Sequence, residues 1–225
     1  MRTDPLEHRA PPLTLFEDDA LLVCVKPRGV LAAADASGAV SMAALLAPRA
    51  VYPVHRLDRD VTGVMVFAKT KAAAAWLSSE KAALQKDYLA VTEGVPPQSE
   101  AELTDLLFHD RVRNKTYVVK RRRAGVKEAR LVYRLLAALP GGRSLLRVRL
   151  FTGRTHQIRV HLAWRNHPIV GDTVYGHKKP ELGLDTQCLH AAALDFIHPR
   201  TGQPVHVECE LPEYFKKALS KLEPL

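Results

Sequence analysis

The sequence has little cysteine and no long hydrophobic run. Its 225 residues include three cysteines, which are far apart and show no C-x-x-C spacing: Cys24, Cys188 and Cys209. This pattern argues against a disulfide framework and against a cysteine zinc site. No run of about 18 apolar residues occurs, which argues against a membrane-spanning helix. Residues 1–5 lack the apolar segment of a signal peptide. We therefore expect a cytoplasmic protein.

Several catalytic signatures are also missing. The chain has no glycine-rich phosphate loop followed by Lys-Ser/Thr, no G-x-S-x-G turn and no H-E-x-x-H helix. His156 and His161 are five residues apart, a spacing that puts the two rings on different sides of a helix or a strand. We therefore expect no bound metal and no nucleotide hydrolysis.

Positive charge is abundant and concentrated in two stretches. The formal net charge is +9, residues 111–130 hold nine basic side chains and one acidic one, and residues 143–165 hold six arginines and no acid. The remainder of the chain is therefore net negative. Clustered basic charge favours a polyanionic partner such as RNA, although a solvated charged hairpin would have the same composition.

The hydrophobic pattern predicts an α+β protein with a mixed, largely antiparallel sheet and flanking short helices. Strands are expected at 20–26, 63–69, 86–93 and 205–211, and a hairpin at 131–136 and 145–150. Ser41 and Thr70 are expected to cap helices at 41–47 and 71–84, and Pro212 to begin a terminal helix. No repeat or linker interrupts the chain, so we expect one catalytic domain at 20–225 after an N-terminal extension at 1–19.

One candidate site is a loop in which five ionisable side chains lie between two apolar stretches. Residues 54–63 contain His55, Arg56, Asp58, Arg59 and Asp60. A cationic neighbour would keep Asp58 ionised, and an aspartate can act as a nucleophile or as a general base. A surface turn with ordinary ion pairs would look the same, so both interpretations stay open.

A second candidate site is the dense polar stretch at 151–163. Gly153 permits a sharp turn, and Thr155 can cap a helix that begins at His156. On that helix Arg159 would lie on the same side as His156. The N-terminus of a helix surrounded by arginines favours an anion, either a phosphate or a carboxylate.

These segments are part of an ordered series of motifs between residues 20 and 212 that resembles the RluA-type family of RNA pseudouridine synthases. Two positions depart from the usual pattern, because Val61-Thr62-Gly63 stands where the family usually has Thr-Ser-Gly. In chain order the motifs are Val25–Gly29 (VKPRG), His55–Asp58 (HRLD), Lys86–Ala90 (KDYLA), Thr152–Leu162 (TGRTHQIRVHL), Pro168–Gly176 (PIVGDTVYG), Leu189–Ala191 (LHA) and His198–Gly202 (HPRTG).

The resemblance implies the pseudouridine synthase fold with a central cleft. It also implies an isomerase that flips a uridine out of structured ribosomal or transfer RNA and converts it to pseudouridine without a metal or an organic cofactor. Asp58 would be the essential carboxylate, with the chemical route left open. Tyr88 would pack against the target base, Arg159 would pair with Asp58, and Arg56 would enter the RNA helix. The other RNA-binding residues expected are His55, Arg154, His156, Gln157, Arg121, Arg122 and Arg123.

The basic stretch at 111–130 is expected to form an arm that grips RNA outside the active site, with Lys120–Arg123 at the tip of a hairpin. Two other classes of function compete with the enzyme. A non-catalytic RNA-binding factor on the same fold fits the charge equally, but such a factor has no need for a carboxylate in a polyanion site. A metal-dependent nuclease would need clustered acids, which are missing. A monomer is the default expectation.

Overall fold

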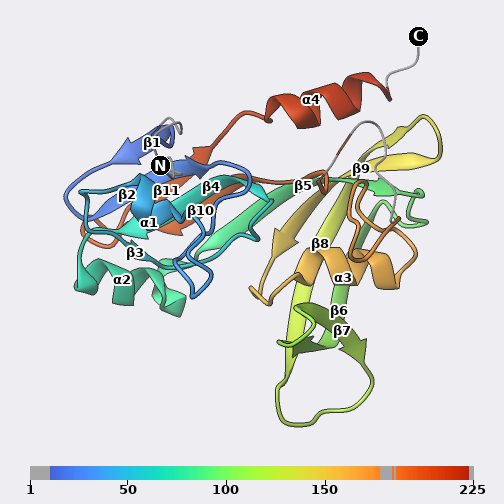
Figure 1. The fold of residues 1–225 in the computed structure, drawn as a ribbon, viewed down its shortest axis with the longest axis horizontal. Helices are drawn as coiled ribbons and strands as arrows, with labels where there is room; N and C mark the ends of the chain where they lie inside the picture. Colours follow the sequence, from blue (N-terminus) through green and yellow to red (C-terminus); the bar gives the residue numbers. More distant parts are fainter. Residues whose placement is uncertain (1–10, 178–183, 185, 223–225) are drawn as a thin grey trace, which may run out of the picture. The chain divides into compact units, whose positions relative to one another are not determined.

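β-strands, largely paired antiparallel, are the main secondary structure of the described residues (Figure 1). The computed structural model describes residues 11–177, 184 and 186–222, so residues 1–5, on which the signal-peptide prediction rests, lie outside it. The chain divides into two compact units. Unit 1 contains the residues up to 85 together with 191–210, and unit 2 contains 86–190 and the residues from 211 onward.

Unit 1 is a sheet in the strand order β1-β2-β4-β10, with β3 paired to β4 and β11 paired to β10. β1 lies within the segment at 1–19 that the sequence suggests is an extension, and it pairs antiparallel with β2. The elements are β1 (Thr14–Glu17), β2 (Leu21–Lys26), α1 (Met42–Leu45), β3 (Tyr52–Pro53), β4 (Thr62–Ala68), α2 (Lys71–Leu77), a 3-10 turn (Glu80–Ala82), β10 (Leu189–Ile197) and β11 (Pro204–Glu208).

The continuous apolar runs of unit 1 form its central strands, as the sequence predicts. Every residue of β4 is buried, because neighbouring strands cover both of its edges and side chains cover both faces. Val23 of β2, Val66 of β4 and Phe196 of β10 share one core cluster with Ala73 and Leu77 of α2. The apolar side of α2 therefore covers this part of the sheet.

Both predicted N-caps of unit 1 are confirmed, but both helices are shorter than expected. The Ser41 hydroxyl accepts from Ala44 N at 3.4 Å, and the Thr70 hydroxyl accepts from Ala73 N at 3.1 Å. The helix predicted over 71–84 ends at Leu77. The Ser79 hydroxyl donates to the carbonyl of Trp76 at 2.6 Å, which takes up an acceptor of the last helical turn.

Unit 2 is a sheet in the strand order β5-β9-β8-β6-β7 with two helices. The predicted hairpin is confirmed: β8 and β9 pair antiparallel across the Pro-Gly-Gly turn, with Leu146 and Val148 buried. The elements are β5 (Gln85–Glu93), β6 (Glu100–Asp110), β7 (Lys115–Val119), β8 (Val126–Leu139), β9 (Arg143–Leu150), α3 (Gln157–Trp164) and α4 (Glu213–Ser220). The strand registers and short helices of both units confirm the α+β class.

The prediction that Lys120–Arg123 forms the tip of a hairpin is wrong. β7 and β8 do not pair with each other, because both pair with β6, which lies between them. The real hairpin is β6–β7, with its turn at 111–114. Residues 120–125 instead cross over β6, where the Arg123 guanidinium lies 4.8 Å from the centre of the Phe108 ring.

No helix of the residues described here combines the length and the apolar character that a membrane crossing would require.

Gly63 marks a close approach between two strands of unit 1. Its φ is +127°, and a Cβ at this position would lie 2.1 Å from the carbonyl oxygen of Ala191 in β10. A backbone atom cannot rotate away as a side chain can. We therefore expect Gly63→Ala to lower the free energy of unfolding by about 3 kcal/mol or more, measured by urea denaturation.

Gly38 is the matched control for this substitution. It also has a positive φ, +69°, but a Cβ there would meet no atom within 4 Å. Gly38→Ala should therefore cost only the backbone strain, about 1 kcal/mol. Equal losses in the two variants would show that the contact with Ala191 does not matter.

Candidate active site

The loop that carries Asp58 is held by a buried lysine. Lys26, at the end of β2, has no solvent exposure, and its Nζ donates to the carbonyls of Pro27 at 2.9 Å, Val30 at 2.8 Å and Arg59 at 2.8 Å. Burying an ammonium is costly unless hydrogen bonds replace its water shell, and these three carbonyls supply that replacement. One cation therefore ties the VKPRG motif to Arg59, the residue that directly follows HRLD.

Backbone hydrogen bonds close the turn at Asp58 itself. Val61 N donates to Asp58 O at 3.1 Å, and Gly29 N donates to Arg59 O at 3.0 Å. The neighbouring Leu57 is buried, whereas Asp58 is half-buried and Arg56 is exposed. The loop thus anchors its apolar side chain in unit 1 and leaves Asp58 partly exposed.

His55 makes a structural contact that the sequence does not indicate. Its Nε2 accepts a hydrogen bond from Val66 N of β4 at 3.1 Å, so a neutral ring carries its proton on Nδ1. This contact fastens the start of the loop to a central strand. The predicted role of His55 in RNA binding stays a prediction.

Arg56 and Arg59 interact electrostatically with Asp35, which lies in an exposed loop. Hydrogen bonds from the hydroxyl and backbone N–H of Ser37 lower the pKa of Asp35, and the charges of the two arginines lower it further. The charges of Arg56 and Arg59 act on Asp35 in the same direction as the Ser37 hydrogen bonds but contribute least to the lower pKa.

In unit 2, the helix predicted from His156 with Thr155 as its cap begins one residue later. His156 has φ +54°, which is left-handed, and α3 starts at Gln157. Among the described residues no side chain caps α3; the Gln157 side chain instead reaches back to the preceding turn, where its Oε1 accepts from Arg154 N at 3.0 Å and from the Thr152 hydroxyl at 2.8 Å. The amide of Gln157 is buried, so the structure places it inside unit 2, whereas Arg154 is exposed.

Arg159 is oriented by Asp172, a residue to which sequence reasoning assigned no role. The guanidinium donates through Nε to one carboxylate oxygen at 2.7 Å and through a terminal nitrogen to the other at 2.9 Å. The exposed fractions of the two side chains are 7% and 0%. Asp172 also accepts from the backbone of Val174 and Tyr175, which fixes the carboxylate. The pairing of Arg159 with Asp58 stays a prediction.

Tyr88 and Lys86 point to the same face of β5, because they are two residues apart in a strand. Tyr88 is buried. Burial also lowers the pKa of Lys86, and its Nζ lies 4.0 Å from the position of a Cβ at Gly153. Among the described residues no oxygen lies within hydrogen-bonding distance of this ammonium. The sequence places Lys86 in the KDYLA motif but does not by itself mark it as a site residue. Its position two residues before Tyr88, on the same face of a strand, is the feature that could have indicated it.

The predicted basic arm is exposed, but its arginines differ in their contacts. Arg121, Arg122 and Arg123 are all exposed. Arg122 forms an ion pair with Glu128 at 2.6 Å, and Arg123 covers the Phe108 ring. Such surface contacts are weak and leave the charges available to a polyanion.

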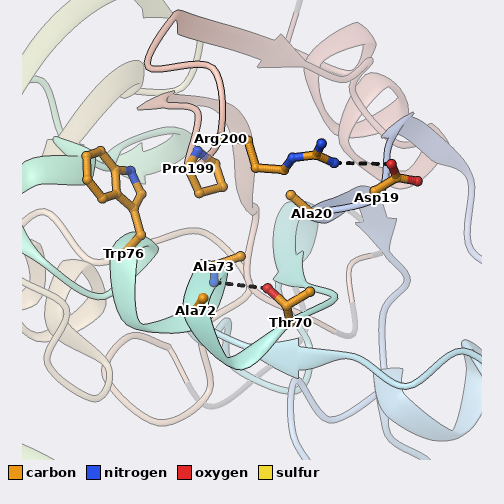
Figure 2. A pocket seen from close by; sticks show the side chains of 8 residues that line it. All are labelled: Asp19, Ala20, Thr70, Ala72, Ala73, Trp76, Pro199 and Arg200. Carbon is orange, nitrogen blue, oxygen red and sulfur yellow. Dashed lines mark hydrogen bonds and ion pairs between the residues drawn. The ribbon is translucent and has the colours of Figure 1, made fainter.

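A hollow of about 520 Å³ in unit 1 contains none of the predicted site residues (Figure 2). In it the Arg200 guanidinium reaches Asp19 at 3.1 Å, and Thr70 caps α2. In the described part of the chain, no three His, Cys, Asp or Glu side chains are grouped so that they could hold a metal ion.

Comparison with known proteins gives consistent matches. The family model described as RNA pseudouridylate synthase matches residues 20–164. Ribosomal large subunit pseudouridine synthase D of Xanthomonas campestris pv. campestris is 37% identical, over 96% of this chain and 72% of the relative. Ribosomal large subunit pseudouridine synthase C of Escherichia coli K12 is 34% identical, over 92% and 69%.

Solved structures show the same fold. Human RNA Pseudouridylate Synthase Domain Containing 4 aligns with a TM-score of 0.73 and 25% identity, over 93% of this chain and 92% of that chain. Human RNA Pseudouridylate Synthase Domain Containing 1 aligns with a TM-score of 0.73 and 23% identity, over 94% and 87%, which is a likeness of fold.

The buried pair predicts a large stability effect. Asp172→Asn removes the negative charge but keeps the shape, and it takes away the carboxylate that holds the buried Arg159 guanidinium through two hydrogen bonds. We expect the free energy of unfolding to fall by about 3 kcal/mol or more, measured by urea denaturation.

The same substitution at the surface serves as the control. Asp19 pairs with Arg200 at 3.1 Å, but its side chain is 90% exposed. Asp19→Asn should therefore change the free energy of unfolding by less than about 1 kcal/mol. A loss at Asp172 no larger than this would mean that burial of the Arg159–Asp172 pair adds nothing.

Proposed function

Because the chain belongs to the RNA pseudouridylate synthase family, we propose that it converts uridines of ribosomal RNA to pseudouridine with Asp58 as its catalytic carboxylate. Enzymes of this family are isomerases. The bond between ribose and base nitrogen breaks, the base turns, and a bond from the ribose to a base carbon forms. Nothing is added or lost overall.

The observation that carries the assignment of Asp58 is the way its loop is built. The buried Lys26 ammonium and the β4 backbone fasten the loop, while Asp58 is half-buried. A rigid loop holds a reacting group in one geometry, which a nucleophile or a base requires. A factor that only binds RNA would gain nothing from a fixed carboxylate, because it repels phosphates.

The choice of ribosomal over transfer RNA is supported by the relatives. Two of them are named as ribosomal large subunit synthases, D and C. The target uridine must leave its stack before its glycosidic bond can be reached, at a cost of a few kcal/mol. The exposed Arg56, in the same loop as Asp58, is suited to fill the space that the base leaves. Tyr88 would pack against the flipped base.

Cations of both units support a polyanionic substrate. Exposed Arg154 and the arm at 111–130 present charge to solvent, and the half-buried Lys86 is suited to a phosphate or a carbonyl oxygen of RNA. We propose that residues 20–225 act as one enzyme, a cytoplasmic monomer that needs no metal. Full activity in excess EDTA would support this, and loss of activity there would favour a metal-dependent enzyme.

Asp58→Asn is expected to abolish pseudouridine formation and to leave RNA affinity within a few-fold, since the amide keeps the shape but cannot act as a carboxylate. The assay is nucleoside analysis of large-subunit ribosomal RNA from cells that lack the gene, after incubation with the protein. Asp60→Asn, a same-type change two residues away, should retain activity. Full activity of the Asp58 variant would refute the assignment.

Replacing Arg121, Arg122 and Arg123 with Ser is expected to weaken RNA binding and to flatten the dependence of log affinity on log salt. Each lost phosphate contact on a single strand removes about 0.7 from the slope, so the three together remove up to roughly 2. Binding titrations at several salt concentrations measure this. Single-turnover rates at saturating enzyme should stay unchanged, because Asp58 and Arg159 are untouched.

The control for the arm is Arg134→Ser. Arg134 is also an exposed arginine of unit 2, and it pairs with Glu100 at 2.9 Å. Arg134→Ser should leave the slope of log affinity against log salt as it is in the unmodified protein. If the triple variant keeps the original slope too, residues 120–125 are a solvated loop and not an RNA contact.

A further inference from the structure

The hydroxyl of Tyr175 lies where three segments of unit 2 meet. Thr116 N, in β7, donates to Tyr175 Oη at 2.7 Å, and His156 Nδ1 lies 2.9 Å from the same oxygen. The Thr116 hydroxyl donates to the carbonyl of Thr155 at 2.9 Å. The basic hairpin β6–β7 is thus joined both to Tyr175 and to the residue that precedes His156.

The hydrogen bonds at this oxygen favour one placement of the protons. A phenol has one proton, and Tyr175 Oη already accepts the N–H of Thr116. Its proton is therefore available for donation to His156 Nδ1, 2.9 Å away. A neutral imidazole that accepts at Nδ1 carries its own proton on Nε2. Burial raises the pKa of Tyr175, which keeps the donor protonated.

Two cations lie against the Tyr175 ring, with Lys115 Nζ 5.3 Å and the Arg159 guanidinium 5.1 Å from its centre. These contacts hold the ring, and with it the hydroxyl, in place beside His156.

Packing also fixes the plane of the His156 ring. The ring meets Tyr175 edge to face at 5.6 Å and 80°, and it meets His109 at 6.1 Å and 84°. The His156 backbone has a left-handed conformation, which residues other than glycine rarely adopt. Both features keep this imidazole in one orientation beside the exposed Arg154.

We propose that Tyr175 is a positioning residue: its hydroxyl holds His156 as the neutral tautomer with the proton on Nε2, from which His156 donates a hydrogen bond to a phosphate oxygen of the RNA. The RNA contact rests on the proposed function. The hairpin turn at 111–114 and His156 belong to one hydrogen-bonded assembly. RNA held by the arm is therefore held in register with His156.

The tautomer can be read without RNA, from the ring nitrogens of histidine in a nitrogen-15 NMR spectrum of the free protein. We expect the protein, at a pH about two units above the usual histidine pKa, to show His156 as the single Nε2–H form. The signal is assigned by its loss in His156→Gln. Tyr175→Phe keeps the ring between its two cations but removes the hydroxyl, so we expect a mixture of both tautomers.

Tyr133→Phe is the matched control for the tautomer. It removes another hydroxyl of a buried tyrosine in unit 2, one that donates to the carbonyl of Gln98 at 3.3 Å. The His156 signal should be unchanged in this variant. A single Nε2–H tautomer that persists in Tyr175→Phe would overturn the positioning role, whatever the activity.

RNA affinity tests the second half of the proposal. Tyr175→Phe and His156→Gln should each weaken binding about three- to tenfold, the size of one lost hydrogen bond, and the double variant should be no weaker than His156→Gln alone. If His156→Gln binds RNA as tightly as the unmodified protein, the phosphate contact is refuted. The effect of Asp58→Asn on pseudouridine formation tests the proposed function separately from either result.

Discussion

The buried ammonium of Lys26 is the interaction on which the Asp58 loop depends. A charge without solvent costs several kcal/mol unless its hydrogen bonds are replaced, so the carbonyls of Pro27, Val30 and Arg59 must converge on Nζ. Two of these carbonyls belong to the turn after β2, and the third belongs to the loop that carries Asp58. Neither segment can move without exposing or stranding the charge. Rigidity of the Asp58 loop thus follows from the cost of desolvation.

Unit 2 also buries a cation, but there a carboxylate compensates the charge instead of backbone carbonyls. Arg159 is buried with a carboxylate that contacts both ends of its guanidinium, and Asp172 is in turn held by backbone N–H groups. Lys86 is half-buried with no such partner among the described residues, and burial lowers its pKa. A compensated cation holds a structure in place, whereas an uncompensated one is suited to a ligand oxygen. Unit 2 contains one cation of each kind: Arg159, which is suited to positioning, and Lys86, which is suited to binding.

The strand order of unit 2 connects the basic arm to the segment around His156. Because β6 lies between β7 and β8, the hairpin β6–β7 forms the edge of the sheet, and Thr116 of β7 reaches both Thr155 and Tyr175. A β7–β8 hairpin would have placed Lys120–Arg123 at a free tip. The observed order instead lays that run across Phe108. The charged residues are exposed in either arrangement, but only the observed one ties the arm to His156.

The sequence by itself determined the local elements and the family. The apolar runs of β2 and β4, the β8–β9 hairpin and the caps at Ser41 and Thr70 depend on residues a few positions apart, and the ordered motifs identify the pseudouridine synthase family. Only the tertiary structure decided the rest. It placed β6 between β7 and β8, paired Arg159 with Asp172, set Lys26 against the Asp58 loop, and gave His156 a left-handed conformation, after which α3 starts at Gln157. Each of these features depends on which polar or charged groups from distant segments are buried together and must bond to one another. The periodicity of residues along the chain does not contain that information.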